Sequence, residues 1–207
     1  MSIKERCIIR AERIYLQSRG IGIPMLIPVF VNYVILPLTI FVLEKSGDYM
    51  KAEEYAWTLA FLLIPLMSVW WVVLMMEKCL EEQGELFCLY ERKKWVDILC
   101  YYSLYCLMIY PLCQYFMNRW FDEFWLSDIA ALLAQCFFSV CLVYLLCVIT
   151  KSVVISFITV LAFTLYINGR LFTILERFGL HNWISGPGYL VVGILCLLIS
   201  ITFQKPR

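Results

Sequence analysis

Long apolar runs separated by short polar segments dominate the chain. Four runs reach the length of about 20 residues that an α-helix needs to cross roughly 30 Å of hydrocarbon: 23–43, 56–76, 98–116 and 129–149. Two further runs, 153–167 and 189–203, are shorter and cross only if the bilayer thins locally or their flanks continue the helix. The runs lack period-2 alternation, and backbone groups in lipid must bond within their own segment. The pattern predicts an all-α integral membrane protein with six transmembrane helices, or fewer if the short runs are re-entrant.

Two flanking segments have the pattern of amphipathic helices. Residues 1–22 combine apolar positions spaced by three and four with a stripe of arginines, which suits the cytoplasmic surface of a membrane. This interface helix either anchors the chain or docks a partner, and its arginines are Arg6, Arg10 and Arg13. Residues 168–188 predict an external helical connection, re-entrant or on the surface. Its helix is expected to end at Gly179, and the "SGPG" at 185–188 is expected to break the chain before the last span.

One polar residue stands out inside the first apolar run. Asn32 lies among prolines at positions 24, 28 and 37, in a segment that is otherwise apolar. Such an amide can hydrogen-bond a neighbouring helix or contact a substrate, and the prolines favour a kinked span.

The composition agrees with burial in lipid. Hydrophobic residues make up 63% of the 207 positions and mean hydropathy is +0.81, which is too much apolar surface for a soluble domain of this size. The first run is too long for the core of a signal peptide and lacks a cleavage pattern, so we expect a retained span. The predicted organisation is the interface helix 1–22, a transmembrane domain 23–203 and a cytoplasmic tail 204–207.

The distribution of charge predicts the orientation. Net charge is only +1, but six spans with an internal N-terminus place twelve of the 17 basic residues on one side. The positive-inside rule therefore predicts a multi-pass protein of the cell membrane with both termini in the cytoplasm. The ten cysteines fall in the runs or on the same side, so no disulfide framework is expected.

Several chemistries lack their residues. The chain has one histidine, no HExxH, no P-loop and no clustered aspartates, so we expect no catalytic residue, no metal site and no cofactor in this chain. Nothing in it points to a nucleic-acid partner. The six runs contain no Asp, Glu, Lys or Arg, which disfavours ion-coupled transport. Energy for any directional work is therefore expected from a partner.

The most charged internal stretch joins the second and third runs. Residues 77–95, on the predicted cytoplasmic side, are acidic up to Gln83, break at Gly84 and restart as a helix that enters the third span. A solvated loop that only fixes topology does not need so many apolar side chains. The positions with the strongest docking character are Glu77, Glu81, Glu82, Gly84, Glu85, Leu86, Leu89 and Tyr90.

On these residues, followed by the basic stretch from Arg92 to Lys94, the chain resembles the membrane subunit of type-2 ABC transporters. The resemblance implies that 77–95 is a coupling helix inserted into a separate ATPase subunit, which carries ATP and Mg²⁺. It also implies a second permease subunit, identical or not, and export of a hydrophobic, lipid-like or peptide substrate. The alternative is a membrane scaffold or accessory subunit of a larger complex that uses the same segment to dock a partner.

Overall fold

The computed structural model describes residues 22–45, 49–80, 94–120, 125–178 and 181–203, with side chains at 22–45, 59–77, 94–115, 129–166 and 186–203. Within these ranges 98% of residues are helical and no strand occurs. The first span is built from four consecutive helical pieces, η1 (Ile23–Leu26), α2 (Ile27–Phe30), η2 (Val31–Ile35) and α3 (Leu36–Lys45). The long helices that follow are α4 (Tyr49–Leu80), α6 (Lys94–Trp120), α7 (Trp125–Thr150), α8 (Val153–Phe178) and α9 (His181–Phe203).

The all-helical fold is confirmed, and five helices in the described residues are long and apolar enough to span a membrane. They are Ile23–Lys45, Leu59–Glu77, Lys94–Tyr115, Ile129–Thr150 and Gly186–Phe203. The apolar part of α8, Val153–Tyr166, is shorter, so a sixth span stays a prediction.

Two local expectations about the end of the chain differ from the structure. Residues 170–178 do not form a separate external helix but continue α8, which keeps every backbone bond of the segment inside one helix. The "SGPG" sequence does not reset the chain, because Gly186, Pro187 and Gly188 all lie inside α9. A methyl group on Gly186 would lie 3.5 Å from the Ala131 Cα, an ordinary van der Waals contact, so α9 packs against α7 at this point.

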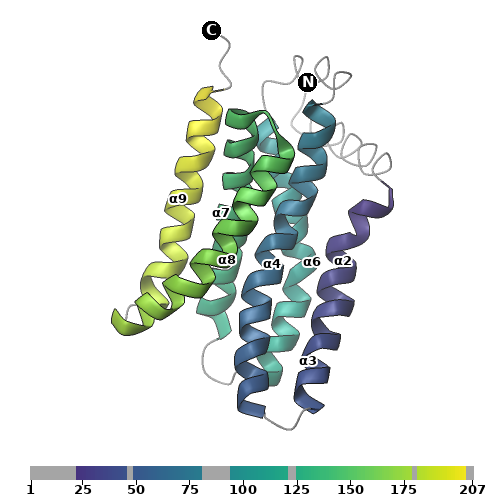
Figure 1. Cartoon of the computed structure of the whole chain (residues 1–207), viewed down its shortest axis with the longest axis vertical. Helices are drawn as coiled ribbons and strands as arrows, with labels where there is room; N and C mark the ends of the chain where they lie inside the picture. The colour runs from purple at the N-terminus through teal and green to yellow at the C-terminus, as the bar shows by residue number, and fades with distance from the viewer. Residues whose placement is uncertain (1–21, 46–48, 81–93, 121–124, 179–180, 204–207) are drawn as a thin grey trace, which may run out of the picture.

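Successive helices run in opposite directions, as Figure 1 shows. The start of the first span, the end of α4, the start of α6, the α7–α8 turn and the end of α9 lie at one end of the bundle, which we call the Ile23 end. The first span ends at the opposite end, the Lys45 end, where α4 begins.

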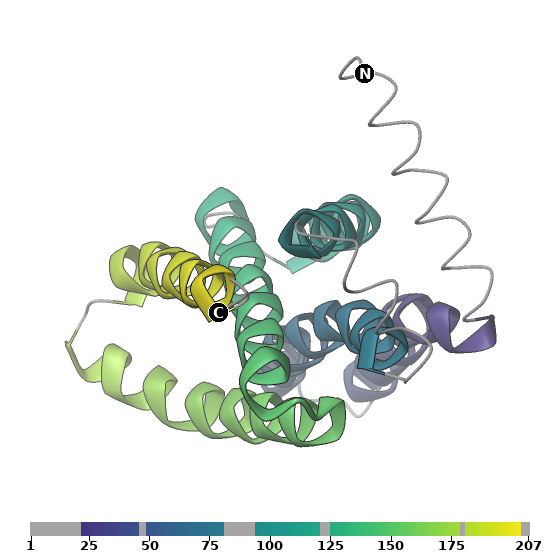
Figure 2. The ribbon, with the colours of Figure 1, turned by 90° about the horizontal axis from the view of Figure 1, so that it is seen from above.

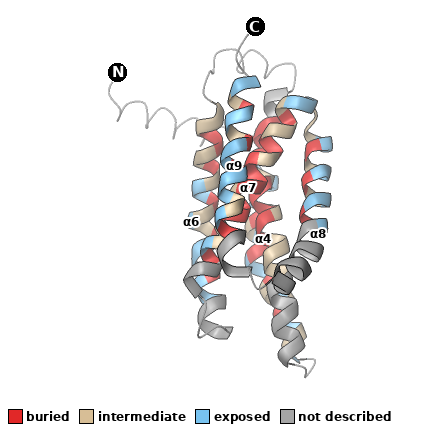
Figure 3. Cartoon of the chain, turned by 90° about the vertical axis from the view of Figure 1, so that its left-hand side faces the viewer, coloured by how far each residue is buried: buried red, intermediate tan, exposed pale blue. Residues whose placement is uncertain are grey.

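Helix α7 is the centre of the bundle. It contacts α4, α6, α8 and α9, whereas α8 and α9 touch each other little. Seen from above, α7 lies between α9 and the helices α4 and α6 (Figure 2), while α8 contacts both α7 and α4. Buried residues gather on α7 and α4, while α9 carries many exposed positions (Figure 3). In a membrane this outer apolar surface faces lipid or another subunit.

Prolines explain the irregular first span. Pro37 has no N–H, and its ring would clash with the carbonyl of Tyr33 in a regular α-helix. The turn before it is widened into a π-turn, in which the Leu36 N–H bonds to the Val31 carbonyl. The expectation that prolines distort this span is therefore confirmed.

Candidate functional site

The predicted coupling segment lies largely outside the described residues. Of its eight candidate residues only Glu77 has a described side chain, exposed near the end of α4. Glu81, Glu82, Gly84, Glu85, Leu86, Leu89 and Tyr90 fall outside the described residues, as do Arg6, Arg10 and Arg13 of the interface helix. The structure describes the two helices that flank this segment. Helix α4 ends at Leu80, α6 starts at Lys94, and both points lie at the Ile23 end (Figure 1).

Charged side chains in the described spans are confined to helix ends. They are Glu44, Lys45, Glu77, Lys94 and Asp97. Asp97 is 4% exposed and lies in the first turn of α6, where the partial positive charge of a helix N-terminus favours a carboxylate. The polar groups buried deeper in the described bundle are neutral amides and hydroxyls.

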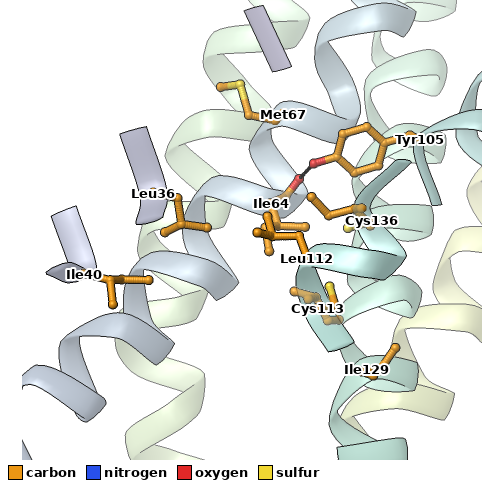
Figure 4. Close-up of a cluster of buried hydrophobic side chains, with 11 residues drawn as sticks. Leu36, Ile40, Ile64, Met67, Tyr105, Leu112, Cys113, Ile129 and Cys136 are labelled. Carbon is orange, nitrogen blue, oxygen red and sulfur yellow. Dashed lines mark hydrogen bonds between the residues drawn. The ribbon is translucent and has the colours of Figure 1, made fainter. Parts of the chain in front are cut away.

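The largest hydrogen-bonded set of these polar groups links three helices through Asn32, Tyr105 and Ile64, and we call it the relay. Asn32, in the π-turn, is completely buried, and its Nδ2 donates a hydrogen bond of 3.0 Å to the hydroxyl of Tyr105 on α6. That hydroxyl donates in turn to the carbonyl of Ile64 on α4, at 2.6 Å. Figure 4 shows the Tyr105 ring with its hydroxyl directed at Ile64, surrounded by apolar side chains. The relay ties the first span, α6 and α4 together at one level.

The side-chain oxygen of Asn32 differs from the nitrogen in its hydrogen bonding. Asn32 Oδ1 is buried and has no hydrogen-bond partner among the described residues. A buried acceptor without a donor is costly in an apolar interior, where water does not compensate it. The amide is therefore satisfied on one side only.

Other hydrogen bonds also run from a side chain to the backbone of a neighbouring helix. Trp70 and Trp71 of α4 donate through Nε1 to the carbonyls of Pro24 and Met25, each at 2.9 Å. Because Pro28 has no N–H, the Pro24 carbonyl accepts from the Ile27 N–H in the 3-10 turn instead, and Trp70 adds a second donor. These two bonds fix the start of the first span to α4.

The same kind of bond fixes α6 to its neighbours. Tyr33 donates to the carbonyl of Met108, and Tyr102 donates to the carbonyl of Leu133 on α7 at 2.9 Å. Side-chain hydrogen bonds of this kind, together with close packing, hold helices together in lipid because apolar contact gives no advantage over contact with lipid tails.

The sequence indicated one partner of the relay and missed the others. Asn32 was identifiable as an amide in an apolar run, and its predicted hydrogen bond to a neighbouring helix is confirmed. Tyr105 carried no signal, because it is one of 13 tyrosines, many of them in apolar runs. The Ile64 carbonyl has no side-chain signature at all. No group of His, Cys, Asp and Glu in the described part of the chain could hold a metal ion.

The apolar helices indicate a multi-pass membrane protein, and within the described residues the buried polar groups other than Asp97 are neutral. Comparisons with protein-family models, with curated proteins and with solved structures found no match.

Proposed function

We propose that this chain is the membrane subunit of an ATP-driven exporter, paired with a separate ATPase chain and with a second permease subunit. ATP and Mg²⁺ belong to the ATPase, and the chain itself performs no catalysis. Residues 77–95 are the coupling segment, and the interface helix with Arg6, Arg10 and Arg13 is the second contact. Both termini lie in the cytoplasm, so the Ile23 end faces the ATPase.

One observation carries this proposal. The helices that flank residues 81–93 both reach the Ile23 end, where the first span also begins. A single partner at that end can therefore touch both segments that the sequence marks for docking. The exposed Glu77 lies at the edge of this face.

The composition of the spans supports the proposed substrate class. Charges stay at the helix ends in the described residues, and the outer faces of the first span, α6, α8 and α9 carry exposed apolar side chains. A pathway between two such subunits has no charged lining in the described ranges, which suits a hydrophobic, lipid-like or peptide substrate. Movement of that substrate needs a state change driven by the partner.

The test is a coupling assay in nanodiscs with ATPases encoded beside this chain. Wild type is expected to co-purify with one of them and to stimulate its ATP hydrolysis. Glu82→Lys reverses a charge, and Gly84→Pro removes a backbone N–H and the backbone freedom of glycine at the predicted break. Each is expected to weaken ATPase binding about tenfold or more, because a charge placed against like charge or a distorted anchor raises dissociation. Lys45→Glu, a charge reversal at the opposite end, is the matched control and is expected to bind normally.

The results separate the two candidate functions. Failure of every ATPase to co-purify refutes the transporter proposal. Binding of an ATPase without any change in hydrolysis, in wild type and variants alike, favours a scaffold or accessory subunit that uses the segment only for docking.

A further inference from the structure

Backbone irregularities in two neighbouring helices lie at the same level of the bundle. The first span has its π-turn at Val31–Ile35, and α4 has Pro65, which donates no backbone hydrogen bond. The relay from Asn32 through Tyr105 to Ile64 joins these two points directly, because Ile64 precedes Pro65 in the chain. Two helices are therefore locally weak at one level, and a third helix bridges them there.

On the Ile23 side of this level, the two helices are fixed to each other. Trp70 and Trp71 hold the carbonyls of Pro24 and Met25 through hydrogen bonds of 2.9 Å. Indole groups are rigid and large, so a displacement of this part of α4 moves the start of the first span with it. The same part of α4 leads to Glu77 and into residues 81–93.

On the Lys45 side, the two helices are held by apolar packing. Leu36 and Ile40 of α3 are buried at 0% and 5% exposure in one cluster with Ile64 of α4. Figure 4 shows these side chains in the same cluster as Tyr105. This cluster, which extends to Met67 beyond Pro65, and the tryptophan hydrogen bonds meet at the level of the π-turn and Pro65, where the relay also lies.

We propose that the π-turn of the first span and Pro65 of α4 form a hinge, and that the Asn32–Tyr105–Ile64 relay is the latch that holds it in the observed state. Packed interiors change between discrete arrangements, and helix irregularities absorb the change in backbone angles. The unpartnered Oδ1 of Asn32 makes the latched state less favourable than a fully satisfied one. The latch is therefore strong enough to select a state and weak enough to release.

The inference extends the transport function proposed above by naming its moving part, but the chain alone tests it. The experiment is hydrogen–deuterium exchange of the full-length protein in lipid nanodiscs, with long labelling times and peptides that cover 29–41 and 60–72. The test variant is Tyr105→Phe, which removes the hydroxyl and keeps the ring. Its matched control is Tyr102→Phe on the same helix, whose hydroxyl bonds α7 instead of the hinge.

Tyr105→Phe is expected to accelerate exchange in both hinge peptides by about fivefold or more, because the variant loses both hydrogen bonds of the hydroxyl. Tyr102→Phe is expected to leave the same peptides at the wild-type rate. Pro37→Ala restores an N–H opposite the Tyr33 carbonyl, so it is expected to slow exchange in peptide 29–41. Asn32→Leu, which removes the amide and fills its space, is the second latch variant if Tyr105→Phe does not fold.

Equal exchange in the two tyrosine variants, whether fast or slow, overturns the hinge, and so does an unchanged rate in Pro37→Ala. The transport proposal fails separately, in the ATPase assay. A chain that exchanges as described but stimulates no ATPase retains the hinge and loses the transporter assignment.

Discussion

The contact between α7 and α9 gives the sharpest stability prediction. Gly193 faces α7, and a methyl group added there would lie 2.8 and 2.9 Å from two ring atoms of Phe137 and 3.2 Å from the Cα of Phe138. Carbon atoms prefer about 3.5–4.0 Å, so Gly193→Ala must displace a ring or move the helices apart by roughly half an ångström. The Phe137 ring is itself packed edge-on against Tyr102, with centroids 5.4 Å apart, and the Phe138 Cα belongs to the backbone.

The expected cost is that of an overpacked core, about 1–3 kcal/mol. Part of it is offset because alanine favours a helix over glycine by up to about 1 kcal/mol. Gly188→Ala isolates that gain, since Gly188 lies in the same helix and a methyl group there meets nothing within 4 Å. The difference between the two variants is therefore the steric cost alone, about 1–3 kcal/mol.

Thermal unfolding in detergent measures this difference. The thiols of Cys141 and Cys196 are buried in one cluster at the α7–α9 contact, so a thiol-reactive dye reports when it opens. At about 2–4 °C per kcal/mol for a chain of this size, Gly193→Ala should melt some 3–10 °C below Gly188→Ala. Equal melting temperatures would refute the close approach of the two helices.

Two further predictions use the same melting assay. Leu36→Ala, at a fully buried position, is expected to cost about 1–3 kcal/mol through the cavity it leaves. Leu38→Ala, 60% exposed on the same helix, should stay within about 0.5 kcal/mol of wild type. Similar losses in both variants would contradict the packing of the first span on α4. In the α7–α8 turn, Lys151 has a φ of 52° and donates its N–H to the Cys147 carbonyl at 3.0 Å. Because glycine adopts this left-handed conformation without strain, Lys151→Gly should raise the melting temperature by about 1–3 °C, whereas Lys151→Arg should not. A lower melting temperature in Lys151→Gly would argue against the left-handed turn.

Hydropathy by itself determined much of the architecture. Run length alone predicted four of the five helices that are long and apolar enough to span, because crossing hydrocarbon sets a minimum length and forbids unpaired backbone groups. The fifth, Gly186–Phe203, reaches that length because its helix continues beyond the short apolar run 189–203. The distorting effect of the prolines on the first span and the inward hydrogen bond of Asn32 also followed from local chemistry. A proline acts on its own turn, and an amide in an apolar segment needs a partner wherever that partner is.

Turn signals near the end of the chain were less reliable. The sequence pattern predicts a break in the helix at Gly186, Pro187 and Gly188, yet all three residues lie within α9. Glycines in a membrane helix also serve close packing against a neighbour, as Gly193 of the same helix does against Phe137. The local pattern is the same for both uses.

The tertiary structure alone decided which face of each span is inside and which residues meet. Leu36 is fully buried and Leu38 is 60% exposed, although both are leucines of one apolar run. In water the polar face of a helix marks its outside, but lipid is as apolar as the interior, so the pattern of a span does not distinguish the two. The partners of Asn32 and Gly193, which lie on helices distant in sequence, could be found only once the helices were packed.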